Sequence, residues 1–203
     1  MNDVDKVIRG KLHVKGEESL PYIGWAKNLS RHGLAELFNE LGYKVGAEIG
    51  VRKAEFTQVL CQKIPGLKIY CVDTWEPYRY GGVTQERQDL YLDVVKKVLQ
   101  PYNHIIMKMT SMEAVKQIQD NELDFVYIDA LHDFDNVMLD LIHWSPKVRS
   151  GGIVSGHDFG FNPSLGIVKA VTAYTQAHNI QSWYITHKLE HGEGFPSWFW
   201  ARR

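Results

Sequence analysis

Short apolar runs alternate with longer amphipathic segments along most of this chain, from about residue 44 onward. The apolar runs are rich in β-branched residues, as buried strands are, and lie at residues 44–49, 67–72, 104–108, 123–128 and 153–155. The intervening segments carry apolar side chains at helical spacing and lie at residues 53–62, 84–99, 111–119, 134–144 and 165–177. Strands that alternate with helices predict repeated β-α units and therefore a parallel sheet.

The two ends of the chain depart from this alternation. Two aromatic stretches, residues 181–187 and 196–202, flank a Gly-rich turn at 190–194 and predict an antiparallel hairpin. Residues 1–43 indicate mixed loop with one amphipathic helix at about 25–41. We therefore expect an α/β fold: a Rossmann-like, seven-stranded, mostly parallel sheet with helices on both faces and an antiparallel C-terminal hairpin.

Length, charge and apolar content narrow the class of protein. A chain of 203 residues with 44% hydrophobic residues can bury one core. With 23 Lys and Arg against 24 Asp and Glu, its net charge of -1 provides no overall positive field for nucleic acid. No run approaches the roughly 20 apolar residues of a membrane span, and the first residues lack the apolar core of a signal peptide. These features predict a cytoplasmic protein. Cys61 and Cys71 lack CxxC spacing, which favours buried thiols over a disulfide or a zinc site.

Acidic and imidazole groups follow two of the predicted strands. Asp129 and His132 come after the apolar run that ends at Ile128, and His157 and Asp158 come after the next run. Because the carboxyl ends of parallel strands meet at one edge of a sheet, we expect these four residues to form one reaction centre. The near-neutral intrinsic pKa of an imidazole makes His132 a candidate general base. The alternative is that His132 only caps the following helix.

The first two predicted strands also end in carboxylates. Glu48 and Gly50 stand at the first strand end, where a ligand can lie against the backbone, although there is no GxGxxG pattern. Asp73 ends the second strand, where an acid accepts hydrogen bonds from ribose hydroxyls in doubly wound folds. A helix cap is the alternative for Asp73. Trp75 lies in an aromatic loop, with Tyr78 and Tyr80, that could stack on a flat ligand.

In order along the chain, these motifs resemble class I S-adenosylmethionine-dependent methyltransferases, most closely the small O-methyltransferase-like group of the methyltransferase domain 24 type. The motifs are Ala47-Glu48-Ile-Gly50-Val51, Val72-Asp73-Thr74-Trp75, Ile128-Asp129-x-x-His132 and Gly151-Gly152 through His157-Asp158-Phe159. The resemblance implies S-adenosylmethionine as cofactor. We expect a methyltransferase domain at 44–203, with 1–43 as an N-terminal helical segment of the same domain that serves as a lid or acceptor wall.

The resemblance also implies where the cofactor lies. Glu48 and Gly50 would border its methionine part, Asp73 would hold the ribose hydroxyls, and the Thr110-Ser111-Met112 segment would border the adenine. The full set of predicted cofactor contacts is Glu48, Gly50, Val51, Asp73, Thr74, Trp75, Thr110, Ser111, Met112 and Asp129. One position departs from the family, which usually has Gly where Ala54 stands, so that a methyl group could narrow the cofactor turn.

A divalent cation, Mg or Mn, is the second implied ligand. In related metal-dependent enzymes, acids at the positions of Asp129 and Asp158 hold the metal, and the histidine at the position of His132 is the base. Asp129, His157 and Asp158 are thus the candidate metal ligands, and Asp129 and His132 the catalytic residues. Imidazole at position 157, where some relatives have a carboxylate, suits manganese better than magnesium. The alternative without a metal has Asp129 orienting the methionine amino group and Asp158 capping a turn.

The expected reaction is metal-assisted O-methylation of a small hydroxylated acceptor, such as a sugar, a phenol or a natural-product-like molecule. Two alternatives stay open: a metal-independent N- or O-methyltransferase, and a nucleotide-binding protein that has lost catalysis. The expected partner is the small-molecule acceptor, with neither nucleic acid nor membrane. The aromatic terminal strands offer a surface for a homo-oligomer.

Overall fold

The computed structural model describes residues 3–12, 22–26, 29–77, 83–160, 166–186 and 195–203. In these residues the strands are β1 (Tyr22–Ala26), β2 (Val45–Ile49), β3 (Lys68–Asp73), β4 (Asn103–Lys108), β5 (Leu123–Ile128), β6 (Val148–Gly156), β7 (Ser182–Thr186) and β8 (Trp198–Ala201). The helices are α1 (Asp3–Lys11), α2 (Arg31–Glu40), α3 (Glu55–Lys63), α4 (Gln85–Leu99), α5 (Ser111–Ala114), α6 (Phe134–Trp144) and α7 (Ile167–Ala177), with short 3-10 turns η1 (Val115–Gln117) and η2 (Ser145–Lys147).

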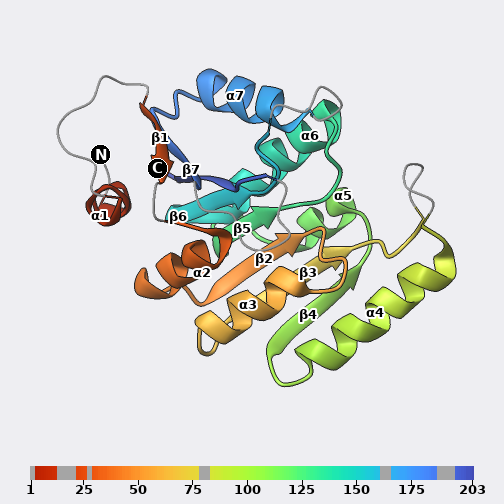
Figure 1. Ribbon diagram of the computed structural model, residues 1–203. Coiled ribbons are helices and arrows are strands. Elements are labelled where there is room, and N and C mark those ends of the chain that lie inside the picture. The colour runs from red at the N-terminus through yellow and green to blue at the C-terminus, as the bar shows by residue number, and fades with distance from the viewer. Residues whose placement is uncertain (1–2, 13–21, 27–28, 78–82, 161–165, 187–194) are drawn as a thin grey trace.

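The strands form a single sheet in the order β1-β7-β8-β6-β5-β2-β3-β4 (Figure 1). Neighbouring strands are parallel except for β8, which runs antiparallel to both β6 and β7. The predicted Rossmann-like sheet, with its antiparallel C-terminal hairpin, is confirmed. The predicted turn at 190–194 lies outside the described residues.

The described residues contain an eighth strand that the sequence pattern did not predict. Strand β1 pairs in parallel with β7 at the edge of the sheet, so the predicted helix at 25–41 is wrong in its first part. That helix begins at Arg31, because the Ser30 hydroxyl accepts a hydrogen bond from the backbone of Gly33 and caps it. Strand β1 is short and owes its conformation to a distant partner, which a local pattern does not reveal.

Helices cover both faces of the sheet, as predicted (Figure 1). On one face α2, α3 and α4 pack through apolar side chains such as Leu34, Leu60 and Val95. On the other face α5, α6 and α7 pack through side chains such as Leu141 and Val171. Apolar side chains dominate the core on both faces of the sheet.

Some element boundaries differ from the sequence prediction. Strand β6 runs through Gly151 and Gly152, where the pattern indicated a break, beside a register irregularity with β5. The Gly151 N–H donates to the Arg202 carbonyl and the Arg202 N–H donates to the Gly152 carbonyl, each at 2.8 Å, so both glycines keep a backbone partner. The predicted helix at 111–119 divides into α5 and η1. Cys61 and Cys71 are buried free thiols, as predicted. No helix in the described part of the chain is long and apolar enough to cross a membrane. The cytoplasmic location stays a prediction.

Candidate active site

The polar residues singled out by the sequence converge at the carboxyl edge of the sheet. Backbone hydrogen bonds continue beyond the strands there: Gly50 donates to Val72 at 2.8 Å, Asp129 to Ile49 at 2.7 Å, and His157 to Ile128 at 3.0 Å. These bonds tie the loops after β2, β5 and β6 to neighbouring strands. The backbone therefore fixes where the side chains of this edge start.

Gly50 allows the end of β2 to lie close to the end of β5. Its φ is +93°, and a Cβ atom there would lie 2.1 Å from the carbonyl oxygen of Asp129. Only glycine avoids both the left-handed strain and this collision. The predicted turn at Gly50 thus brings the end of β2 against the end of β5.

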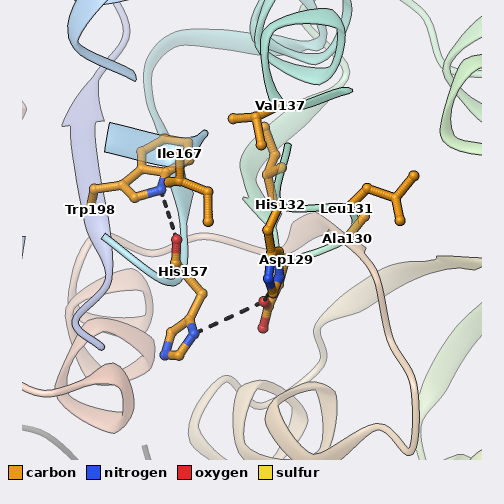
Figure 2. Close-up of a pocket in the computed structure, with 9 residues that line it drawn as sticks. Asp129, Ala130, Leu131, His132, Val137, His157, Ile167 and Trp198 are labelled. Atoms are coloured by element: carbon orange, nitrogen blue, oxygen red, sulfur yellow. Dashed lines mark hydrogen bonds and ion pairs between the residues drawn. The ribbon is translucent and has the colours of Figure 1, made fainter. Parts of the chain in front are cut away.

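Asp129, His132 and Asp158 form one cluster of acid and imidazole groups. Nε2 of His132 lies 3.2 Å from a carboxylate oxygen of Asp158 and 3.7 Å from one of Asp129. Nδ1 of His157 lies 3.1 Å from Asp158 and 4.0 Å from Asp129. Figure 2 shows the His157 ring directed toward the Asp129 carboxylate, with His132 close to the same aspartate. The four residues expected to meet do lie together.

The carboxylates and imidazoles of this cluster shift each other's pKa values. The interaction with Asp129, followed by the charge of Asp158, raises the pKa of His132 against the opposing effect of burial. Burial alone would raise the pKa of Asp158, but its hydrogen bond with His157 and the nearby imidazoles lower it below the usual range. Both shifts have one physical cause, the attraction between the imidazoles and the carboxylates.

The donor set suits a divalent cation. One ligand atom each from Asp129, His132 and Asp158 lies within 4.8 Å of the others, which is the convergence that a shared ion requires. Two oxygens and one nitrogen favour manganese, iron or zinc over magnesium. The geometry groups His132 with the acids, whereas the sequence assigned the third ligand to His157. His132 has a 36% exposed side chain, against 8% for His157.

Glu48 lies next to this cluster but is fully enclosed. Its side chain is 2% exposed, and the Thr57 hydroxyl donates to one of its oxygens. Burial raises the pKa of Glu48 to about 8, although the charge of Arg31 opposes the shift. Glu48 is therefore part of the site but is shielded from bulk water.

Arg31 is a residue of the site that the sequence reasoning missed. From the first turn of α2 its Nη2 donates to Asp129 at 3.0 Å and lies 4.0 Å from Glu48. Its guanidinium carbon lies 4.4 Å from the ring centre of Phe56 and 5.2 Å from that of Tyr127. A helix predicted from residue 25 placed Arg31 in mid-helix. The Ser30 cap signal just before it could have marked Arg31 as the first residue of the helix.

Asp73 ties two loops together at the end of β3. Its carboxylate accepts hydrogen bonds from the backbone N–H of Arg52 at 2.8 Å and of Trp75 at 2.9 Å. The Trp75 indole donates to the carbonyl of Arg52 at 2.9 Å, and its side chain is fully buried. The prediction that the Trp75 ring offers a stacking surface is therefore wrong, because the ring belongs to the core. Tyr78 and Tyr80 lie outside the described residues.

Ala54 adopts the backbone conformation that favours glycine. Its φ is +61° and ψ is +29°, at the residue immediately before α3, and its side chain is fully buried. A left-handed alanine costs about 1 kcal/mol or more relative to a right-handed one. The departure from the family pattern therefore falls at a position whose geometry is of the glycine type.

A cavity of about 490 Å³ lies on the side of the site where the sequence motifs place the adenine of the cofactor. Thr74 and Thr110, two of the predicted contacts, line it together with Lys108 and Glu113. Val51 lies buried after the Gly50 turn. Ser111 and Met112 are absent from the lining of this cavity.

The Ser111 hydroxyl is turned toward α6. It donates to the buried carboxylate of Asp140 and accepts from the Trp144 indole at 2.7 Å. The structure thus places Ser111 in a polar network between two helices. Its predicted contact with the cofactor would have to come from its backbone.

A second cavity, beside His132, is far smaller. It has about 10 Å³ of space, enough for about one water molecule. Its lining includes Val137, Ile167 and Trp198 (Figure 2).

Comparison with known proteins identifies the class. Residues 47–159, more than half of the chain, match the model of the methyltransferase domain family. The chain belongs to this family. The predicted resemblance to class I S-adenosylmethionine-dependent methyltransferases of the O-methyltransferase-like group is thereby confirmed.

Solved structures share the fold at low sequence identity. The O-methyltransferase from Bacillus cereus in complex with SAH aligns with a TM-score of 0.60 and 13% identity, over 97% of this chain and 87% of that one. The O-methyltransferase TomG from Streptomyces achromogenes, involved in tomaymycin synthesis and in complex with SAM, aligns with a TM-score of 0.61 and 10% identity. The alignment covers 100% of this chain and 91% of that one.

A curated relative is the uncharacterized protein y4gI of Sinorhizobium fredii. It is 25% identical over 116 residues, which are 57% of this chain. The matched region is 12% of the length of that relative, so the chain spans a small part of it.

Proposed function

We propose that this methyltransferase transfers the methyl group of S-adenosylmethionine to a hydroxyl of a small acceptor, such as a sugar, a phenol or a natural-product-like molecule, with the help of a divalent cation. The observation that carries the proposal is the convergence of Asp129, His132 and Asp158 on one point of the sheet edge. Solved O-methyltransferases of the same fold, in complex with SAM or SAH, support the cofactor assignment.

The cofactor would lie across the ends of β2 and β3. Glu48, Gly50 and Val51 would border its methionine part, and Asp73 would accept the ribose hydroxyls. Thr74 and Thr110, which line the large cavity, would border the adenine together with backbone of the segment that follows. The sulfonium carries an activated methyl group, so the chain's main task is to align the acceptor oxygen with it.

Two roles remain for the cluster: to hold the cation and to take the acceptor's proton. When bound, a divalent cation lowers the pKa of a hydroxyl that coordinates it. Asp129 and Asp158 would hold the cation, with buried His157 as the nitrogen ligand. His132, whose side chain is more exposed, would accept the proton at Nε2 and keep it near both acids.

A second assignment has His132 as the nitrogen ligand, and the 4.8 Å convergence favours it. The two assignments differ in what His132→Gln changes. If His132 is the base, Mn²⁺ affinity stays within about threefold of wild type and the rate of methyl transfer falls, roughly 100-fold. If His132 is a ligand, Mn²⁺ affinity falls as it does for Asp158→Asn.

The proposal is tested by titrating Mn²⁺ and S-adenosylmethionine separately into the protein by calorimetry. We expect Asp158→Asn to weaken Mn²⁺ binding at least 10-fold. Asp120→Asn is the matched control, because Asp120 pairs with Lys147 on the surface and should leave Mn²⁺ binding unchanged. Transfer of labelled methyl to a panel of hydroxylated acceptors should stop in EDTA and return with Mn²⁺. Transfer that persists in EDTA and in Asp158→Asn would show that the metal mechanism is wrong.

A further inference from the structure

Arg31 brings a guanidinium group to the strand ends where the sequence motifs place the methionine part of the cofactor. Its Nη2 lies 3.0 Å from Asp129 and 4.0 Å from Glu48. The Arg31 side chain is only 17% exposed. A cation at this depth, between the carboxyl groups of Asp129 and Glu48, acts at short range.

Two aromatic rings hold the Arg31 guanidinium in place. Its carbon lies 4.4 Å from the ring centre of Phe56, on α3, and 5.2 Å from that of Tyr127, on β5. A planar guanidinium that lies against rings and bonds an acid has little freedom left to lose when a ligand arrives. Arg31 is therefore preorganised at these strand ends.

The amino-acid end of S-adenosylmethionine carries an ammonium and a carboxylate side by side. Asp129 suits the ammonium, and the carboxyl oxygens of Glu48 can accept hydrogen bonds from it, but the charge of Asp129 by itself would repel the carboxylate. A guanidinium has five N–H donors in one plane, so it can keep its bond to Asp129 and donate to a second carboxylate. We propose that Arg31 binds the carboxylate of the cofactor's amino-acid end and so selects cofactors that retain it.

This inference rests on the proposed function, since it assigns one more residue to the same cofactor site. It extends that proposal in naming what the N-terminal segment contributes: α2 supplies a cofactor-binding side chain. The prediction of the segment as a lid or acceptor wall would then be incomplete.

The test compares two ligands that differ only in the carboxylate: S-adenosylmethionine and decarboxylated S-adenosylmethionine. Binding of each is measured by calorimetry for the wild type, Arg31→Met and Arg31→Lys. Loss of a charge-assisted, bidentate contact should weaken S-adenosylmethionine binding roughly 10- to 100-fold in Arg31→Met. The affinity for the decarboxylated ligand should change less than about threefold. Arg31→Lys, which keeps the charge without the fork, should lie between.

Arg149→Met is the matched control. Arg149 also pairs with an aspartate, Asp124, at 2.7 Å, and lies 5.4 Å from the ring centre of Tyr43. It does so at the amino edge of the sheet, at the start of β5 and β6. Its replacement should leave the affinities for both ligands unchanged while costing comparable stability.

Equal weakening of both ligands in Arg31→Met and Arg31→Lys would overturn the inference, because Arg31 would then act only by positioning Asp129 or α2. Unchanged binding of both would overturn it as well. A wild-type protein that binds neither ligand would refute the proposed function itself. Thermal unfolding of each variant without ligand shows whether it is folded, and the lysine variant keeps the test valid if the methionine variant is not.

Discussion

At the scale of single residues, the sequence identified the acid and imidazole groups of the site but not all of the residues that surround them. Asp129, His132 and Asp158 follow apolar runs, and any parallel sheet brings such positions to one edge. The burial of Trp75 could not be read in the same way, since an aromatic residue after a strand can face a ligand or the core equally well. Arg31 was missed because its contacts depend on where α2 docks, which no local pattern encodes.

Gly50 gives the sharpest prediction at this scale. Gly50→Ala places a Cβ atom 2.1 Å from a backbone oxygen at a φ of +93°, so we expect it to cost roughly 3 kcal/mol or more of unfolding free energy. Gly42→Ala is the control, because Gly42 has a φ of +74° with nothing within 4 Å of the new atom. It should cost only about 1 kcal/mol. Urea denaturation of both variants measures the difference, and equal costs would contradict the collision at Gly50.

Asp140 gives a prediction about pH. Burial raises its pKa to about 6 in the folded protein, against the hydrogen bond from Ser111. Because the folded state then holds a proton that the unfolded state releases, stability falls as pH rises from about 4 to 6 and stays reduced above that. Asp140→Asn removes the buried charge, so it should gain about 1 to 2 kcal/mol at pH 7.5 and show a flatter profile.

The check on Asp140 is thermal unfolding at a series of pH values between 4 and 8. Asp120→Asn is the control, since Asp120 lies on the surface and pairs with Lys147. If Asp140→Asn is no more stable than the wild type at pH 7.5, the buried carboxyl is ionised at little cost. The network with Ser111 and Trp144 would then stabilise the charge.

At the scale of elements, prediction succeeded where the local pattern and the tertiary fold agree. The β-α units from β2 to α7 are long enough, and buried enough, for periodicity to identify them. It failed at β1, whose residues gain their conformation from pairing with β7, far along the chain. The limits of β6 were missed for a related reason, because Gly151 and Gly152 find their backbone hydrogen-bond partner in Arg202, far along the chain.

The cap of α2 carries a prediction at this scale. The Ser30 hydroxyl accepts a hydrogen bond from Gly33 at 3.1 Å and starts the helix that presents Arg31. Ser30→Ala should cost about 1 kcal/mol of stability and weaken S-adenosylmethionine binding, because Arg31 is the next residue. Thr84→Ala is the control, since Thr84 caps α4 through Arg87 in the same way. It should cost similar stability without changing that affinity, as urea denaturation and calorimetry would show.

At the scale of the whole molecule, the active site is a product of topology. Strands β2, β3, β5 and β6 are parallel neighbours, so their carboxyl ends deliver Glu48, Asp73, Asp129 and Asp158 to one edge. Helices on both faces keep water from the sheet and leave this edge as the place where ligands can enter. The shared edge can be predicted from the sequence because parallel β-α units are joined by right-handed crossovers, which leaves few alternative arrangements of the strands.

A ligand that binds only the folded protein must stabilise the whole molecule. If the Asp129, His132 and Asp158 cluster binds Mn²⁺, a free concentration 100 times the dissociation constant should add about 2.7 kcal/mol to the unfolding free energy. Without the ion, folding brings the carboxylates of Asp129 and Asp158 close together, near imidazoles that lose their charge as the pH rises. The repulsion between the two carboxylates therefore grows with pH, and the bound ion should relieve it. The gain should vanish in EDTA and in Asp158→Asn, and persist in Asp120→Asn, as followed by thermal unfolding at fixed pH. A wild-type melting temperature that does not respond to Mn²⁺, in a protein that binds S-adenosylmethionine, would leave a metal-independent methyltransferase as the function of this site.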